Sequence, residues 1–189
     1  MKVITNVDYY KVAKLIKNNH IVAIYQGRSE GGPRALGNRS ILFNPSLPET
    51  SKIVNMRKMR EWYRPVAGSI LLEDFEDWFI TVSLKETPFM THAVEVNRKK
   101  SDFIPAIVHK NNTCRIQTVS KENNIHYYNL IKTFKQLTGI PVIGNTSLNL
   151  GGQPIANTLK DALNVIQNSR FEYLYLPEKK SLIYAMNGG

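Results

Sequence analysis

The chain has 189 residues, of which 42% are hydrophobic and 21% charged, a balance typical of one soluble globular domain. The single cysteine, Cys114, excludes an internal disulfide framework and a cysteine metal cluster. No apolar run approaches the roughly 18 residues of a membrane helix, and residues 1–8 lack a signal-peptide core, so we expect an intracellular, cytoplasmic protein. The net charge of +10 indicates an anionic partner, unless it only forms a solvated basic surface.

The hydrophobic pattern predicts helices that alternate with strands. Helical spacing of apolar residues occurs at residues 7–18, 51–62, 126–138 and 158–167, with Asp8, Ser51 and Thr158 as caps and Gly139 as a stop. Apolar runs predict strands at residues 21–25, 40–43, 67–72, 141–144, 173–176 and 182–186, and a hairpin of residues 104–108 with 113–119. Residues 73–103 are irregular and residues 145–152 have the composition of a polar loop. This interleaving predicts one α/β domain.

Arginines are concentrated in one part of the chain, whereas lysines are spread evenly. The guanidinium group is a planar fork that suits bidentate binding of phosphate, so local clustering of arginine is more informative than the net charge. Six arginines lie between residues 28 and 64: Arg28, Arg34, Arg39, Arg57, Arg60 and Arg64.

The first candidate site is the glycine-rich segment 26–40, in which arginines alternate with glycines that let the backbone approach a ligand closely. It has neither a Walker P-loop nor a dinucleotide fingerprint. The alternative is a surface loop with incidental charge.

The second candidate is segment 55–65, where several cations lie within reach of one anion. If the segment stays helical, Arg57, Arg60 and Arg64 share a face. If it becomes extended at Lys58, then Lys58 and Arg60 share a face instead. A solvated basic helix is the alternative interpretation.

The third candidate is segment 144–152, which follows a predicted buried strand, where open α/β sheets usually bind ligands. Its hydroxyls and amides suit phosphate oxygens or a carbamoyl amide, although a polar turn is the commoner outcome for such a loop. The four histidines show no ligand spacing, so we predict no protein-bound transition metal. His109 could contact phosphate from the predicted hairpin, and Cys114 is expected to be a small packed side chain.

Taken in order, these segments resemble the C-terminal domain of the nodulation and antibiotic-biosynthesis O-carbamoyltransferases (NodU/CmcH type). The resemblance extends over about residues 21–176, and we take residues 1–189 as this one domain. Its most specific block is Gly-Pro-Arg-Ala-Leu-Gly-Asn-Arg-Ser at residues 32–40. A Lys-x-Arg pair, Lys58 and Arg60, and a Ser-x-Asn pair, Ser147 and Asn149, complete the pattern.

The resemblance implies a YrdC-like α/β domain, with a twisted mixed sheet, flanking helices and a basic central cavity. Such domains are similar in activity: they bind carbamoyl phosphate, release carbamate from it, and join that to ATP as carbamoyl-adenylate with loss of pyrophosphate. By resemblance, the catalytic residues are Lys58, Arg60 and Arg64, which hold carbamoyl phosphate with Ser147 and Asn149. The ATP site would comprise Arg28, Arg34, Arg39, Arg115, Asn145, Thr146 and Ser147, and Mg²⁺ would accompany the nucleotide.

The resemblance also implies a missing partner. The family's actin-like N-terminal domain, which transfers the carbamoyl group to an acceptor hydroxyl, has no counterpart in these residues, so we expect it as a separate subunit or domain. Two positions depart from the family pattern. Gly68 stands where we expect proline, which predicts a looser turn, and Gln153 stands where we expect glutamate, which removes one negative charge.

Two other functions stay open at this point. A nucleic-acid-binding module would explain the net charge, but the arginines occur in glycine-rich turns rather than along a helix with interleaved aromatics. A regulatory subunit that binds nucleotide without turnover is compatible with the same residues.

Overall fold

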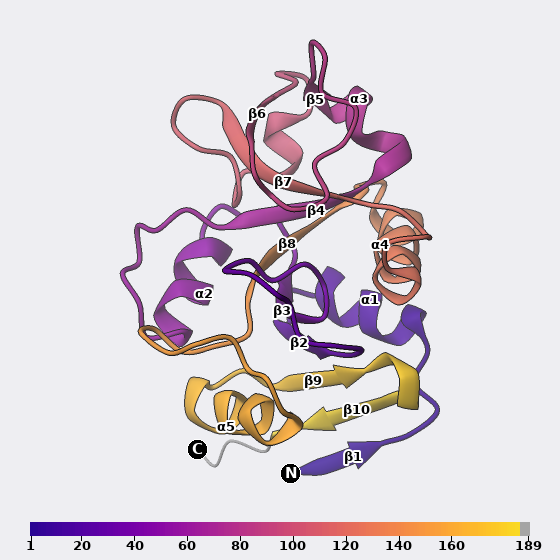
Figure 1. Cartoon of the computed structure of the whole chain (residues 1–189), viewed down its shortest axis with the longest axis vertical. Coiled ribbons are helices and arrows are strands. Elements are labelled where there is room, and N and C mark those ends of the chain that lie inside the picture. Colours follow the sequence, from indigo (N-terminus) through magenta and orange to yellow (C-terminus); the bar gives the residue numbers. More distant parts are fainter. Residues whose placement is uncertain (186–189) are drawn as a thin grey trace.

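The structure, a computed structural model, describes residues 1–185 of the chain. It is built on one ten-stranded mixed sheet with the strand order β1-β10-β9-β2-β3-β8-β4-β7-β6-β5 (Figure 1). The strands are β1 (Lys2–Ile4), β2 (Val22–Tyr25), β3 (Arg39–Phe43), β4 (Ala67–Leu71), β5 (Phe79–Ile80), β6 (Ala93–Val96), β7 (Thr113–Val119), β8 (Val142–Ser147), β9 (Tyr173–Leu176) and β10 (Ser181–Tyr184).

Strand β8 lies at the middle of the sheet. It pairs antiparallel with β3 on one side and with β4 on the other. The parallel pairs are β2 with β9 and β4 with β7. Because the sheet mixes both kinds of pairing, with helices beside it, the predicted mixed α/β class is confirmed.

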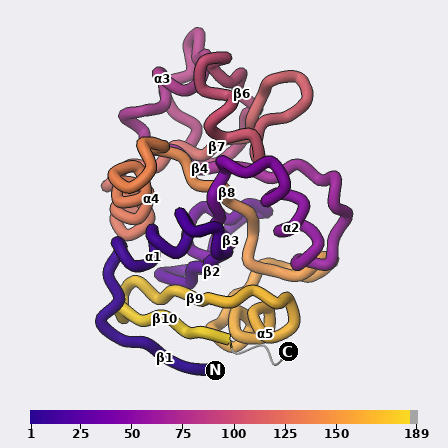
Figure 2. Tube along the Cα trace, turned by 180° about the vertical axis from the view of Figure 1, so that it is seen from behind, coloured from indigo at the N-terminus to yellow at the C-terminus, as the bar shows by residue number. Residues whose placement is uncertain are grey.

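The helices begin and end largely where local sequence signals place them. They are α1 (Tyr9–Lys17), α2 (Thr50–Arg57), α3 (Phe75–Trp78), α4 (Ile125–Thr138) and α5 (Leu159–Ser169). The side chain of Asp8 caps α1, Thr158 and Asp161 form a capping box on α5, and Gly139 ends α4 with a φ of 78°. Helices α1 and α4 pack together, whereas α2 lies on the other side of the sheet's middle strands in both views (Figures 1 and 2).

Two predictions from apolar and polar runs are wrong. Residues 104–108 form no strand, because Ile104 and Ile107 bury their side chains from a turn in which Ile107 N–H donates to the Ile104 carbonyl. Strand β7 therefore pairs with β4 and β6 rather than with this segment. Asn145, Thr146 and Ser147 are not loop residues, since they extend β8 and pair with β3.

Other boundaries also differ from the sequence-based expectation. Helix α2 starts one residue before Ser51 and stops at Arg57, well short of Trp62. Strand β1 has no counterpart among the predicted elements, and β5, β6 and α3 lie in the segment left unassigned. The last predicted strand was extended to Met186, which lies outside the described residues. Within the described residues, no helix combines the length and hydropathy needed to cross a bilayer.

Gly68 lies within β4, so the looser turn expected there is absent. It pairs with Ile116 of β7 and Gly144 of β8. A Cβ at this position would lie 2.5 Å from Ile107 Cδ1, so the close packing of residues 104–107 onto the sheet requires glycine.

Candidate functional site

The candidate residues converge on one edge of the central strands. β3, β4 and β7 begin at this edge and β8 ends there, so Ser40 of β3 faces Ser147 of β8. Ala67, at the start of β4, pairs with Asn145 and lies beside Arg115, because the next residue, Gly68, pairs with Ile116. Segments far apart in the sequence therefore meet here.

Lys58 is the most deeply buried cation of this edge, with 1% of its surface exposed. Its ammonium group donates to the Ser147 carbonyl, to Ser147 Oγ at 3.2 Å and to Asn149 Oδ1 at 2.9 Å. Burial and the nearby charge of Arg60 lower the pKa of Lys58 to about 6. The structure thus joins the Lys-x-Arg and Ser-x-Asn pairs through direct hydrogen bonds.

Arg60 and Arg64 extend this positive charge toward the surface. Arg60 Nε donates to Asn55 Oδ1 at 2.6 Å, and its Nη2 is buried without a partner in the described structure. Burial first, and then the charge of Arg64, lower the pKa of Arg60. Arg64 is half-exposed and pairs with Glu61 at 2.7 Å. The buried Nη2 amino group of Arg60 is therefore left for an anion to bind.

The turn between Lys58 and Arg60 follows neither geometry considered from the sequence. Helix α2 stops at Arg57, and Met59 adopts a left-handed φ of 57°. Gly151 N–H donates to the Lys58 carbonyl at 2.7 Å, and a Cβ on Gly151 would lie 2.5 Å from the Met59 carbonyl oxygen. The 148–152 loop therefore packs directly on the Lys-x-Arg turn.

Glu30 organises the glycine-rich segment. Its Oε1 accepts three backbone N–H bonds, from Leu36 at 3.0 Å, Asn38 at 2.8 Å and Arg39 at 3.1 Å. Gly37 has a φ of 105° and lies against the Tyr127 ring, where a Cβ would be 2.3 Å from the ring. The loop that carries Arg34 is therefore folded by its own carboxylate and anchored on α4.

Arg39 braces the base of this loop. Its guanidinium lies 3.7 Å from the centre of the Tyr25 ring and donates to the carbonyls of Gln26, Gly27, Asn38 and Asn157. Since these carbonyls take most of its donors, Arg39 is held in place by protein. Arg28 is exposed, and its carbonyl accepts from the Asn38 side chain.

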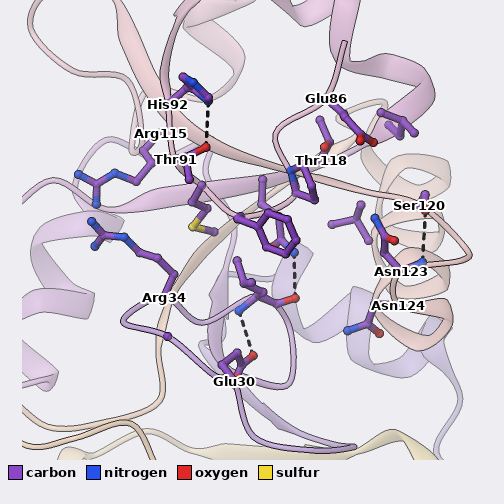
Figure 3. Close-up of a pocket in the computed structure, with 18 of the residues that line it drawn as sticks. Glu30, Arg34, Glu86, Thr91, His92, Arg115, Thr118, Ser120, Asn123 and Asn124 are labelled. Atoms are coloured by element: carbon purple, nitrogen blue, oxygen red, sulfur yellow. Dashed lines mark hydrogen bonds between the residues drawn. The ribbon is translucent and has the colours of Figure 1, made fainter. Parts of the chain in front are cut away.

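A cavity of about 1400 Å³ opens beside this edge, under the glycine-rich loop and segment 86–93 (Figure 3). Arg34 and Arg115 extend side by side at one end of it, and Ser120, Asn123 and Asn124 lie at the other (Figure 3). Burial and the charge of Arg34 lower the pKa of Arg115. The rest of the lining is mixed, with apolar side chains such as Leu36, Leu72, Pro88, Met90 and Val119.

A buried polar network lies behind the cavity. Asn145 Nδ2 donates to the Ala35 carbonyl at 3.1 Å and to Ser69 Oγ at 3.0 Å, and Ser69 Oγ donates to Gln117 Oε1 at 2.8 Å. Gln117 Nε2 in turn donates to the Leu36 carbonyl. Asn145 therefore fastens the loop to the sheet through its side chain, while Thr146 and Ser147 continue toward the edge of the sheet.

His109 and Cys114 belong to neither the Lys58 group nor the cavity lining. His109 Nδ1 bonds Thr113 Oγ1 at 2.9 Å, and burial followed by the charge of Arg115 lowers the pKa of His109. Cys114 is fully buried, and this burial raises the pKa of its thiol. Among residues 1–185, no three His, Cys, Asp or Glu side chains group in a way that could hold a metal ion.

The structure brings seven of the predicted residues together in two groups and leaves Arg28, Arg39, Asn145 and Thr146 outside them. Lys58, Arg60 and Arg64 form one group with Ser147 and Asn149, and Arg34 forms the other with Arg115. Sequence reasoning missed four supporting residues, Asn55, Glu30, Ser69 and Gln117. Asn55 and Glu30 lie in the candidate segments 55–65 and 26–40, but no local pattern indicates their hydrogen-bond partners.

Comparison with known proteins agrees with this arrangement. The family model described as "Carbamoyltransferase C-terminus" matches residues 13–181. The nodulation protein NolNO of Sinorhizobium fredii is 39% identical over 178 residues, which cover 90% of this chain and 26% of that protein. The chain thus spans about a quarter of the length of this curated relative.

Solved structures show the same fold at low identity. Full-length HypF, in its phosphate- and nucleotide-bound form, has a TM-score of 0.61 at 21% identity and covers 85% of this chain and 23% of HypF. Sua5 of P. abyssi, complexed with L-threonine, has a TM-score of 0.63 at 14% identity and covers 89% of this chain and 46% of Sua5. The fold is YrdC-like, as predicted. By its sequence and its architecture, this chain belongs to the carbamoyltransferase C-terminal family.

Proposed function

We propose that this chain is the carbamoyl-activating portion of an O-carbamoyltransferase, forming carbamoyl-adenylate from carbamoyl phosphate and ATP. The observation that carries the proposal is that two cationic groups lie at the same end of the central strands, and that one of them, Arg34 with Arg115, lines the cavity. Arg64 lies three residues before Ala67, whose neighbour across the strands is Arg115, and Arg115 lines the cavity. An anion at Lys58 would therefore lie next to the phosphates of a nucleotide held by Arg34 and Arg115.

In this proposal, Lys58, Arg60 and Arg64 hold carbamoyl phosphate together with Ser147 and Asn149. Water attacks the carbonyl carbon of carbamoyl phosphate. The bond from this carbon to the phosphate oxygen breaks, and carbamate and inorganic phosphate are formed. A carbamate oxygen then attacks the α-phosphorus of ATP, the bond between the α and β phosphates breaks, and pyrophosphate leaves. The positive charges stabilise the negative charge that develops on the phosphoryl oxygens, which is the main protein contribution to such transfers.

The cavity would hold the ATP. Arg34 and Arg115, which line it, would bind its phosphates. Arg39 would act only by bracing the base of the glycine-rich loop, and Arg28 is exposed and outside the lining. Asn145, Thr146 and Ser147 lie where β8 meets the site. Mg²⁺ would accompany the phosphates, and it is commonly bound by substrate phosphates together with one or two protein carboxylates. Glu30, Glu86 and Glu122 line the cavity and could supply them.

We also propose that a partner portion completes the transfer to an acceptor hydroxyl. The relatives are far longer than this chain, and the surface beside Lys58 is unusually apolar. Helix α2 turns Thr50 and Asn55 inward and exposes Ile53 and Met56. Met59, Trp62 and Tyr63 continue this surface, and each is more than 60% exposed. Such a patch beside a site that makes a water-sensitive intermediate supports covering by a second domain.

The direct test is pyrophosphate release from ATP and carbamoyl phosphate, with the chain alone and with a partner present. Lys58→Ala or Arg64→Ala should raise the KM for carbamoyl phosphate by about 10- to 100-fold, because each removes a charged hydrogen-bond donor. Arg98→Ala, which removes an exposed arginine outside the site, is the matched control.

The proposal has two clear points of failure. Absence of pyrophosphate release by the wild-type chain under both conditions would sink the activation reaction. Normal turnover of both site variants would refute the assignment of residues. Salt-sensitive binding of mixed-sequence nucleic acid that ATP does not change would favour the nucleic-acid-binding alternative.

A further inference from the structure

Asn55 is a polar side chain in the inward face of α2, with 0% of its surface exposed. A buried amide is unfavourable unless its donors and its acceptor are satisfied. Its Oδ1 accepts from Arg60 Nε at 2.6 Å, and its Nδ2 donates to the carbonyls of Trp62 at 3.0 Å and Arg64 at 2.8 Å. One side chain thus binds three points of the segment that carries the cations.

From Arg60 to Arg64 this segment has few other restraints besides the ion pair of Arg64 with Glu61. Beyond the helix end, the Asn55 carbonyl accepts from Arg60 N–H at 3.1 Å, and Arg64 N–H donates to the Glu61 carbonyl at 3.2 Å. Between these points the chain turns through Met59 in a left-handed conformation and exposes Trp62 and Tyr63. The path from Arg60 to Arg64 is therefore set largely by the amide of Asn55.

The like charges of Lys58, Arg60 and Arg64 repel one another in this arrangement. The charge of Arg60 helps to lower the pKa of Lys58, and that of Arg64 helps to lower the pKa of Arg60, an effect that Glu61 partly offsets. Arg64 is already half-exposed and pairs with Glu61, whereas Arg60 makes no ion pair within the described residues. Asn55 instead fixes Arg60 through Nε and leaves Nη2 buried and unpartnered within the described structure.

We propose that Asn55 is a positioning residue, which holds Arg60 and Arg64 in the geometry that binds the phosphate of carbamoyl phosphate. Asn55 touches neither substrate and acts only through the two arginines. The identity of the anion rests on the proposed function; the positioning of an anion site by Asn55 does not.

The experiment compares Asn55→Ala and Asn55→Asp with wild type. Alanine removes all three bonds; aspartate keeps the shape, loses both donors to the carbonyls and puts a carboxylate against Arg60. Both should raise the KM for carbamoyl phosphate by about 10- to 100-fold, because each loses the bonds that position the arginines, and both should leave the KM for ATP within about two-fold.

A matched control separates positioning from stability. Asn44 is also buried, and its Nδ2 donates to the Lys17 carbonyl and to Asn19 Oδ1. It follows the last residue of β3, whereas Arg39 is the first residue of that strand, so Asn44 lies at the end of β3 away from the site. Asn44→Ala should lower the melting temperature without moving either KM. Equal KM values in wild type and both Asn55 variants, or parallel losses for carbamoyl phosphate and ATP, would overturn the proposal.

Calorimetric titration with inorganic phosphate distinguishes this inference from the proposed function. If wild type binds phosphate but releases no pyrophosphate with or without a partner, the proposed function fails. The positioning role is then judged by phosphate binding, which must weaken in both Asn55 variants and not in Asn44→Ala. If wild type binds neither inorganic phosphate nor carbamoyl phosphate, the positioning role is overturned as well.

Discussion

Lys58 combines two properties that oppose each other at neutral pH. Its three oxygen acceptors match the three donors of an ammonium group, and Ser147 Oγ directs its own hydrogen to Asn149 Oδ1 at 2.6 Å. Burial nevertheless lowers the pKa of Lys58 to about 6, since no carboxylate compensates the charge. An arriving anion supplies the missing negative charge and raises this pKa again.

Anion binding should therefore take up protons between about pH 6.5 and 8. Calorimetry in HEPES and in Tris, whose ionisation enthalpies differ, should give different apparent enthalpies for carbamoyl phosphate, and Lys58→Met should abolish the difference. The effect on folding has the same origin: the unfolded chain binds a proton at Lys58 that the folded chain releases. The free energy of unfolding should rise with pH from about 6 toward the unfolded value of 10.5, and less so in Lys58→Met. Identical enthalpies in the two buffers would show that Lys58 keeps its charge throughout.

At the scale of single residues, sequence reasoning found the cations and not their supports. Lys58, Ser147 and Asn149 belong to a specific motif, and the structure joins them by hydrogen bonds. Arg39 shares the sequence signature of a phosphate ligand, but its carbonyl partners come from two separate segments that no local pattern brings together. Glu30 was missed because its role is to bind backbone N–H groups six to nine residues further along the chain.

Among the elements, β4 is packed so closely at Gly68 that the sheet has no room for a side-chain carbon there. A methyl group on Gly68 would meet Ile107 Cδ1 at 2.5 Å, Ile116 Cδ1 at 3.1 Å and Val142 Cγ1 at 3.3 Å. We expect Gly68→Ala to lower the free energy of unfolding by about 1–3 kcal/mol, as overpacking of a core does. Ile107→Val removes the nearest methyl, so the double variant should be more stable than Gly68→Ala alone.

Denaturant unfolding of the four proteins measures this coupling. Ile107→Val by itself should cost about 0.5–1.5 kcal/mol, because it leaves a small cavity. Additive losses in the double variant would contradict the steric explanation, because two independent sites would then be involved.

Helices α1, α4 and α5 were predictable from sequence to within two residues because their signals are local, whereas α2 ends five residues early and α3 was not predicted. Asp8, Thr158 and Gly139 act within one turn of their own helix. Strand partners were not predictable in this way. The apolar residues of segment 104–108 are buried as expected, yet they pack from a turn, and β7 instead finds β4, more than forty residues earlier in the chain.

On the scale of the whole molecule, the exposed apolar surface of α2 and the adjoining turn is the feature that a lone domain does not explain. Lys52 Nζ lies 5.5 Å from the centre of the Trp62 ring, and the Trp62 and Tyr63 rings meet edge to face at 5.8 Å, so the aromatics form one continuous patch with α2. Helix α2, which carries part of this patch and ends next to Lys58, lies apart from α1 and α4 (Figures 1 and 2).

Changing the patch should separate activation from transfer. Trp62→Ser with Tyr63→Ser should leave pyrophosphate release by the chain unchanged and reduce carbamoyl transfer to a hydroxyl acceptor, by about ten-fold or more, when a partner portion is supplied. Val82→Ser, at a fully exposed apolar residue elsewhere, serves as the control. Loss of pyrophosphate release in the double variant would instead make the two aromatics part of the substrate site.

The central position of β8 also determines when the strands of the sheet can pair during folding. β3 and β4 do not pair with each other. Both pair with β8, residues 142–147, which lies about a hundred positions after β3 in the chain. During synthesis, the β2–β3 pair and the group of β4, β7, β6 and β5 therefore expose unpaired edges until most of the polypeptide has left the ribosome. Contacts so distant in sequence make folding slow, and they make the nascent chain dependent on protection from aggregation until its middle strand arrives.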